Sequence, residues 1–288
     1  MRYDPVMNVK NKRILVTAGL VAALSSSVEA TFHFMQIEQA IGGVNGDTTA
    51  QAIQLRMRSN SQNLLGGAKL WVRDATGSRP VLLIDFATSV PNGAAGARVL
   101  IASPSFTTTT TPITIPDFTL TNLIPVRYLA AGSMTFENNS GSQIYWRLSW
   151  GNASYTGSNL GSCINDDSVC PAAGDFGPAW PGPLPSGGVE ALQFQGAFNA
   201  VSTNNAADYA LTAGPSTWIN NAGESFVLPA SAPCPWDCEP DPDGNVGITD
   251  FLALIGRWGQ VGSPCDFGGG GVGITAFLDL LANWGPCP

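Results

Sequence analysis

DPDGNVGITDFLALIGRWG, residues 241–259, holds a segment that the chain repeats 26 residues later as VGITAFLDLLANWG, residues 272–285. Nine of the fourteen aligned positions are identical, but Asp250 of the first copy becomes Ala276 in the second. In each copy the apolar spacing places positions 251, 254, 255 and 258, or their equivalents, on one face of a helix, with a Thr before it and a Gly after it. Because a helix this short cannot bury its apolar face alone, we expect the two copies to pack together.

The residues before the first helix, EPDPDGNVGITD at 239–250, have the layout of a twelve-residue calcium loop with a Gly at its sharp turn. Calcium takes six to eight oxygen ligands, which alternate residues of such a loop can supply. The predicted ligands are Glu239, Asp241, Asp243, Asn245 and Asp250. A solvated acidic turn is the alternative that the sequence leaves open. The second loop carries Cys265, Phe267, Gly269 and Ala276 at the ligand positions, so we expect one calcium site and not two.

The duplicated loop and helix, the Trp-Gly endings and the flanking cysteines resemble a GC-type dockerin, a module of secreted bacterial proteins. The resemblance covers residues 234–288, and position 1 of the first loop departs from it because Glu239 stands where the family usually has Asp. In that family each loop normally binds calcium, and loop positions 10 and 11 contact a cohesin partner. Carried over, the partner-binding residues are Ile248, Thr249, Ile274 and Thr275.

All six cysteines follow residue 30, and an even number in an exported chain suggests three disulfides. Cys163 and Cys170 close a short loop and are expected to pair locally, with free thiols or a metal site as alternatives. Four cysteines in the dockerin-like segment allow three pairings. Cys238 and Cys265 stand at equivalent starts of its two loops, while Cys234 and Cys287 bracket it, so we predict the pairs 238–265 and 234–287.

The preceding 200 residues predict a β-sandwich, so the fold class is mainly β with a small helical module at the end. Short alternating segments are separated by Gly-rich and Asn-rich turns. In QAIQLRMR, for example, Ile53, Leu55 and Met57 face one way and polar residues the other, as in a sheet with one buried face. The predicted strands lie at 32–39, 51–58, 68–75, 80–86, 98–103 and 143–150.

Further segments complete the predicted organisation. The Thr-rich tract 107–116 is expected to be an edge strand or an exposed loop, and 191–202 and 224–229 are expected to be closing strands. We predict a signal peptide at 1–30, a β-sandwich domain at 31–229, a linker at 230–233 and a dockerin-like module at 234–288. The opening of the body, FHFMQIEQAIGGVNGDTTAQAIQLRM, resembles lamin-tail-like sandwiches of secreted bacterial proteins.

The predicted signal peptide has basic residues before an apolar run at 14–24 and small residues near Ala30. Without residues 1–30, which hold four basic and two acidic side chains, 9 basic and 19 acidic residues remain, a net charge of −10. Such a surface disfavours nucleic acid and anionic lipid as partners. We therefore expect a secreted or cell-surface protein with no membrane span after cleavage.

Catalysis has little support in the sequence. His33 is the single histidine, and we expect it to be structural. Twelve acids in the body could include a glycosidase pair, but the sequence does not bring any two together. Tyr145, Trp146, Trp150 and Tyr155 cluster near one strand and are expected to be core residues rather than an exposed platform for sugars.

The sequence therefore leaves two hypotheses for the function. The first is a non-catalytic body assembled through a calcium-binding module that docks a cohesin-like or other extracellular protein. The alternative is a secreted carbohydrate-active enzyme or polysaccharide-binding protein with the same module.

Overall fold

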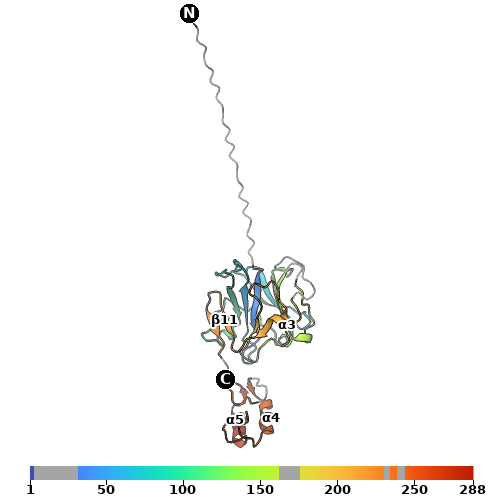
Figure 1. The fold of residues 1–288 in the computed structure, drawn as a ribbon, viewed down its shortest axis with the longest axis vertical. Coiled ribbons are helices and arrows are strands. Elements are labelled where there is room, and N and C mark those ends of the chain that lie inside the picture. Colours follow the sequence, from blue (N-terminus) through green and yellow to red (C-terminus); the bar gives the residue numbers. More distant parts are fainter. Residues whose placement is uncertain (3–31, 162–175, 230–233, 239–243, 288) are drawn as a thin grey trace.

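The computed structural model describes residues 1–2, 32–161, 176–229, 234–238 and 244–287. The predicted signal peptide, the Cys163–Cys170 pair and the predicted linker at 230–233 lie outside these residues, apart from positions 1 and 2 of the signal. Within the described residues the chain is mainly β, and Figure 1 shows a strand-rich body and a smaller C-terminal segment with two helices. No helix among these residues is long and apolar enough to cross a membrane.

The body contains two large sheets. One has the strand order β10-β9-β1-β2-β5-β6, and its only parallel pair is β5 with β6. Its strands are β1 (Met35–Ile41), β2 (Ala52–Met57), β5 (Arg98–Ala102), β6 (Phe118–Thr119), β9 (Leu192–Phe194) and β10 (Tyr209–Leu211). The other is fully antiparallel, with the order β4-β3-β7-β8. Its strands are β3 (Ala68–Arg73), β4 (Val81–Asp85), β7 (Gly132–Asn138) and β8 (Ile144–Trp150).

The two sheets share one apolar core, so the body has a sandwich-like arrangement. Ile53, Leu55 and Met57 of β2 enter this core from the first sheet, and Trp146 and Leu148 enter it from the second. All five are fully buried. The aromatic cluster near β8 is also buried, which confirms the prediction of core packing for its four residues, Tyr145, Trp146, Trp150 and Tyr155.

The outer face of the larger sheet differs from the prediction of one buried face, because it is covered too. A hairpin of β11 (Thr217–Ile219) and β12 (Ser225–Val227) lies in a second core with the helix α1 (Pro104–Thr107). Trp218 and Phe226 of the hairpin belong to this core together with Ala52 and Leu100 of the sheet. Ala52 and Ala102 of the sheet lie in the same core as the large side chains of the hairpin.

The predicted strands correspond to β1 to β5 and β8, with ends that differ by a few residues. The segment 191–202 contributes only the short β9, and 224–229 contributes β12. Within 107–116, Thr107 ends α1 and the following residues form a loop tied to β12 by a bridge between Thr111 and Val227. The sequence missed the strands β6, β7, β10 and β11. It also missed α1 and the short helical turns α2 (Val126–Leu129), η1 (Asn152–Ser154) and α3 (Asn205–Asp208).

The C-terminal segment has its own small core around α4 (Ile248–Gly256) and α5 (Ile274–Ala282). Disulfides join Cys234 to Cys287 and Cys238 to Cys265, the pairing predicted from the sequence. The short strands β13 (Asn245–Val246) and β14 (Gly285–Pro286) pair and bring the end of the segment beside its first loop. The helices begin at Ile248 and Ile274, with Gly247 and Gly273 as their N-caps. The Thr is therefore the second residue of each helix, and the prediction of a Thr before the helix is wrong.

Candidate functional site

Buried charges in the body form structural ion pairs on the sheets. Glu38 is 3% exposed, and its carboxylate accepts bonds from Arg98 at 2.7 and 3.0 Å and from Gln54 at 2.7 Å, with Arg56 at 2.9 Å. Burial lowers the pKa of Arg56, while the Glu38 charge opposes that shift. Two guanidinium groups thus neutralise one buried carboxylate on the outer face of the larger sheet.

Glu137 of β7 occupies a similar position on the other sheet. It is 2% exposed and lies 3.3 Å from the Arg73 guanidinium. Burial raises the pKa of Glu137, and Arg73 opposes this shift. His33 is half-buried beside the rings of Phe34 and Tyr145, and burial together with the Arg58 charge lowers its pKa. These contacts suit a neutral, packed imidazole, as expected for a structural histidine.

Asp117 and Glu224 lie near a cavity of about 280 Å³ that Arg98, Asn220 and Asn221 help to line. Burial raises the pKa of Asp117, and the Glu224 charge adds to the shift. However, Asp117 accepts the Leu100 and Asn221 N–H groups at 2.7 and 2.9 Å, and Glu224 accepts from the Asn220 amide at 2.8 Å. Both carboxylates are thereby used to fix the turn before β12.

The helix pair of the C-terminal segment is apolar on two faces. Its inner face holds Leu254 and Leu280, both fully buried, and the two copies pack together as predicted. The predicted four-residue face is nevertheless wrong for Ile255 and Trp258, which are 46% and 50% exposed. With only nine residues per helix and Gly or Ala at many neighbouring positions, the core is too small to bury both apolar faces.

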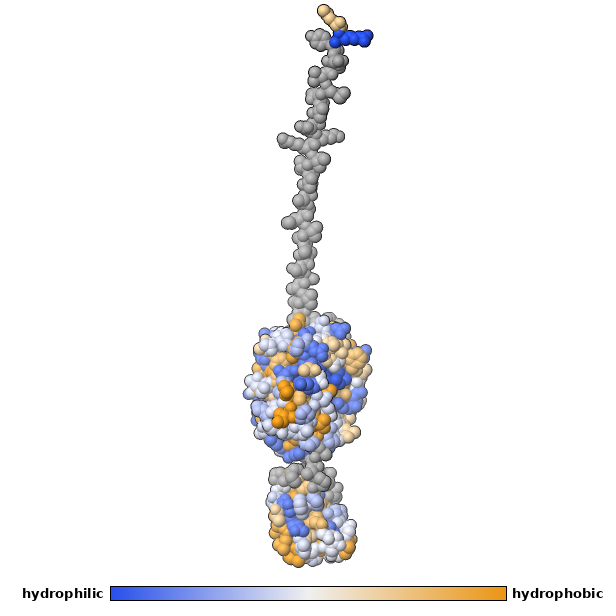
Figure 2. Space-filling model, turned by 90° about the vertical axis from the view of Figure 1, so that its left-hand side faces the viewer, coloured by the Kyte–Doolittle hydropathy of each residue, from blue (hydrophilic) through white to orange (hydrophobic). Residues whose placement is uncertain are grey.

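Both helices therefore present exposed apolar residues at equivalent positions. We call these eight residues the outer stripes: Ile248, Leu252, Ile255 and Trp258 of the first copy, and Ile274, Leu278, Leu281 and Trp284 of the second. Their exposure runs from 46% to 63%. Figure 2 shows apolar side chains on the surface of this segment. A helix that is apolar nearly all round is normally buried on all sides.

The contact between the helices places both outer stripes on one side of the pair. Phe251 meets Phe277, its equivalent in the second copy, with ring centroids 5.9 Å apart. At about 100° per residue, Phe251 lies on the flank between Ile248 on the outside and Leu254 in the core. Because both helices meet through the same flank and share the same core, their outer stripes point away from that core together. We call this combined surface the apolar platform.

The charged side chains in the described part of the C-terminal segment are less exposed than the apolar residues of the outer stripes. Its charged residues are buried or half-buried, and its exposed residues are apolar, Gly, Pro, Asn, Gln or Thr. Ile248, Thr249, Ile274 and Thr275, the predicted partner-binding residues, are all exposed. Recognition through this surface would depend on apolar burial and on Thr hydroxyl groups rather than on ion pairs.

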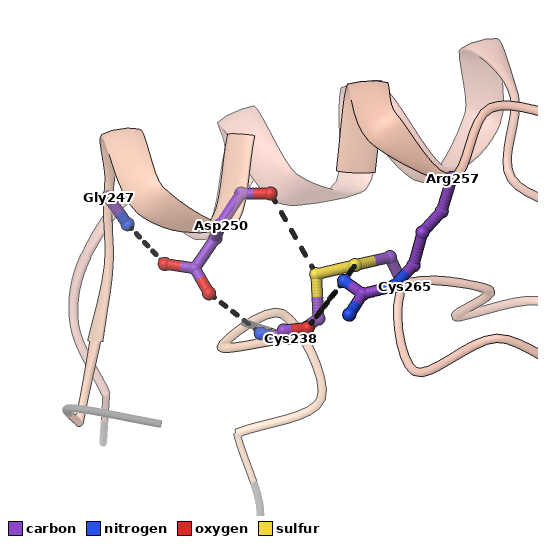
Figure 3. The surroundings of a disulfide bond; sticks show 5 residues. All are labelled: Cys238, Gly247, Asp250, Arg257 and Cys265. Carbon is purple, nitrogen blue, oxygen red and sulfur yellow. Dashed lines mark hydrogen bonds between the residues drawn. A yellow bond between two sulfur atoms is a disulfide. The ribbon is translucent and has the colours of Figure 1, made fainter. Parts of the chain in front are cut away.

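Asp250 fastens the first loop to the first helix (Figure 3). It is fully buried, and its two carboxylate oxygens accept the N–H groups of Gly247 at 2.8 Å and Cys238 at 2.7 Å. The first bond caps the helix in the manner of an acid at the third helical position. Arg257 donates to the Cys238 carbonyl at 3.1 Å and completes the link between the helix and the Cys238–Cys265 disulfide.

The second loop is fastened differently. At the offset of 26 residues, Cys238 aligns with Pro264, the residue before Cys265, and Pro264 has no N–H group to donate. A buried acid at position 276 would lack that partner, and the chain has Ala276 there, 3% exposed. Asp266 closes this loop instead, because its carboxylate accepts the N–H groups of Gly262 at 2.9 Å and Gly271 at 3.0 Å. Cys265 adds the covalent link.

The described calcium-loop residues are compatible with the predicted site. Gly244 has a φ of +80°, which suits the sharp turn of such a loop. Asp250, at position 12 of the loop, is fully buried, and its carboxylate accepts two backbone N–H groups. Asn245 is exposed beside this turn, and Glu239, Asp241 and Asp243 lie outside the described residues. Calcium binding therefore stays a prediction.

Sequence reasoning missed two features of this site. It placed Ile255 and Trp258 on the packed face and gave Leu252 no role, although the spacing of Ile248, Leu252 and Ile255 forms a second helical face. It also left Asp266 without a role, because this acid is off the register of calcium ligands.

Comparison of the chain with models of known protein families finds no match, and a search of curated proteins finds none.

Proposed function

We propose that the protein acts outside the cytoplasm as a non-catalytic β-sandwich body assembled or anchored through its C-terminal module, which docks another extracellular protein on the apolar platform. The observation that carries this proposal is the pair of equivalent, uncharged outer stripes on a disulfide-linked helix pair. Two disulfides are typical of an oxidising or extracellular environment. The dockerin-like layout supports a cohesin-like partner.

The size of the platform supports one partner that covers both helices. Burying four half-exposed large side chains of a single helix contributes roughly 3–6 kcal/mol. Association of two proteins costs an estimated 4–15 kcal/mol in lost freedom, so one stripe alone gives little net affinity. Burial of both stripes, with hydrogen bonds to Thr249 and Thr275, brings the favourable contribution to the size that a specific complex needs.

Calcium and the disulfides have a common role in this proposal. The first loop binds one calcium ion through Glu239, Asp241, Asp243, Asn245 and Asp250. The second loop, held by Cys265 and Asp266, needs none. Both loops are then rigid before the partner arrives, and little ordering free energy opposes docking.

Calorimetric titration of the chain with calcium chloride tests the metal site. We expect one ion per chain in the wild type and none in the Asp241→Ala, Asp243→Ala double variant. Two ions per chain, or none in the wild type, would remove the calcium part and leave the platform to be tested separately.

Docking is tested by binding of purified cohesin domains and of proteins captured from the extracellular fraction and identified by mass spectrometry. Each identified protein is then produced alone and titrated with the wild type and with the Leu252→Glu, Leu278→Glu double variant. The proposal expects a partner whose affinity falls at least about a hundredfold in the variant. Equal binding of both chains by every partner found would contradict it.

A further inference from the structure

The two outer stripes that make up the apolar platform carry nearly the same residues at equivalent positions. Phe251 and Phe277, equivalent residues of the two copies, meet at the centre of the helix pair. Ile248, Leu252 and Trp258 of one stripe have identical residues in the other, and Ile255 has Leu281. A second copy can therefore meet this face with like stripes against like stripes, which is the geometry of an isologous interface.

The area of the platform is that of a stable dimer interface. Large apolar side chains present on the order of 200 Å² each when fully exposed, so eight of them at about half exposure offer roughly 800 Å². A standard-size interface takes about that area from each partner. Monomeric proteins seldom leave an apolar patch of this size in water.

Charge does not oppose this pairing. The whole chain has a net charge of −8, which favours repulsion between copies at most surfaces. None of the eight outer-stripe residues is charged, and the described charged residues of the segment are less exposed than these eight, so two platforms would meet with apolar side chains at their centre. The platform is thus the part of the described surface best suited to a second copy.

We propose that, in the absence of its partner, the chain forms a homodimer through the apolar platform, and that the partner must displace the second copy to dock. That the partner and the second copy compete for this surface rests on the proposed function. The dimer itself requires only the geometry of the platform.

Sedimentation velocity of the whole chain, exported so that its disulfides form, tests the dimer. At concentrations up to about 200 µM we expect the wild type to change reversibly between monomer and dimer. Leu252→Glu with Leu278→Glu should be monomeric throughout, with at least a thirtyfold weaker association. Both sites are 57–60% exposed and Glu is a good helix former, so the fold should persist. An unchanged melting temperature and intact disulfides would confirm that the double variant is folded.

The double variant Ile113→Glu with Ile115→Glu is the matched control, because these body residues are 67% and 60% exposed and the variant adds the same two charges. It should dimerise as the wild type does. If the Glu pair fails to fold, Leu252→Gln with Leu278→Gln replaces it, with a smaller weakening expected.

A wild type that stays monomeric at about 200 µM would overturn the dimer and leave docking of another protein untouched. Dimers that persist in the folded Glu pair would overturn it as well, because they would form elsewhere. Failure of the proposed function is a separate result: no identified partner would distinguish the wild type from the Glu pair, whatever the oligomeric state.

Discussion

The two copies of the loop and helix share their outer face but differ in how their loops are held. Exposure of the outer stripes is almost equal in the two, at 61% and 63% for Ile248 and Ile274. The first loop depends on a buried carboxylate, Asp250, whereas the second has Ala276 at that position and a half-buried Asp266 elsewhere. The two copies thus have the same exposed apolar residues but hold their loops through different contacts. This is expected if the exposed face, and not the way each loop is held, binds a partner.

Removal of a disulfide should have the largest effect on both copies. Cys238→Ser with Cys265→Ser opens a link across 27 residues, and the loss of that closure costs about 3–4 kcal/mol. Cys234→Ser with Cys287→Ser opens 53 residues and should cost about 4 kcal/mol. Hydrogen exchange of α4 and α5 measures both. Unchanged protection in either variant would show that the small core holds without that link.

Asp250→Asn should come next and should act on the first copy. An amide offers one acceptor oxygen and opposes the second N–H with its own N–H₂ group, so either Gly247 or Cys238 loses its partner. The expected cost is about 2–3 kcal/mol, seen as faster exchange in α4 before α5. An equal loss of hydrogen-exchange protection in α4 and α5 would mean that the two copies unfold as one unit.

Ala276→Asp tests whether the two copies can be made alike. The new carboxylate would be buried, with the Gly273 N–H in reach but no donor at Pro264. We expect a loss of about 2 kcal/mol because one oxygen stays unsatisfied. Leu278→Asp, at an exposed site of the same helix, is the control for the charge. A stabilised Ala276→Asp chain would refute the explanation based on Pro264.

Asp266→Ala should have a smaller effect, about 1 kcal/mol, confined to the second loop. It removes two bonds from backbone N–H groups, but those groups lie near solvent and can bind water instead. Proteolysis at residues 262–271 should become faster, and the first loop should keep its resistance. Faster proteolysis of both loops would contradict the view that each loop is held independently.

The smallest effect on stability is expected for Leu252→Glu with Leu278→Glu, within about 0.5 kcal/mol, because both side chains face solvent. Thermal unfolding measures this. A large loss would mean that the outer stripes already have a partner within the chain.

The sequence predicted the sandwich-like body well where alternation is strong, as in β2, whose Ile53, Leu55 and Met57 face the core. It missed β7, because a Gly and a Ser start this strand and weaken its pattern. It also could not show that the outer face of the larger sheet is buried, since the covering hairpin with Trp218 comes from more than a hundred residues further along the chain.

In the helix pair, sequence spacing predicted the shared core of Leu254 and Leu280 and both disulfide pairs. It did not reveal that Ile255 faces water, because a helix that is apolar on two sides gives no single preferred face. Which side becomes internal depends on the contact between Phe251 and Phe277, which is a tertiary feature.

Hydroxyl-radical footprinting of the chain within its own extracellular fraction tests the central claim, that another protein chain covers the platform. Leu252 and Leu278, at 60% and 57% exposure, are compared with Ile113 of the body at 67%. The account predicts strong protection of both leucines relative to Ile113, with protection lost on dilution of the purified chain. Leucines that react as readily as Ile113 in that fraction would contradict it.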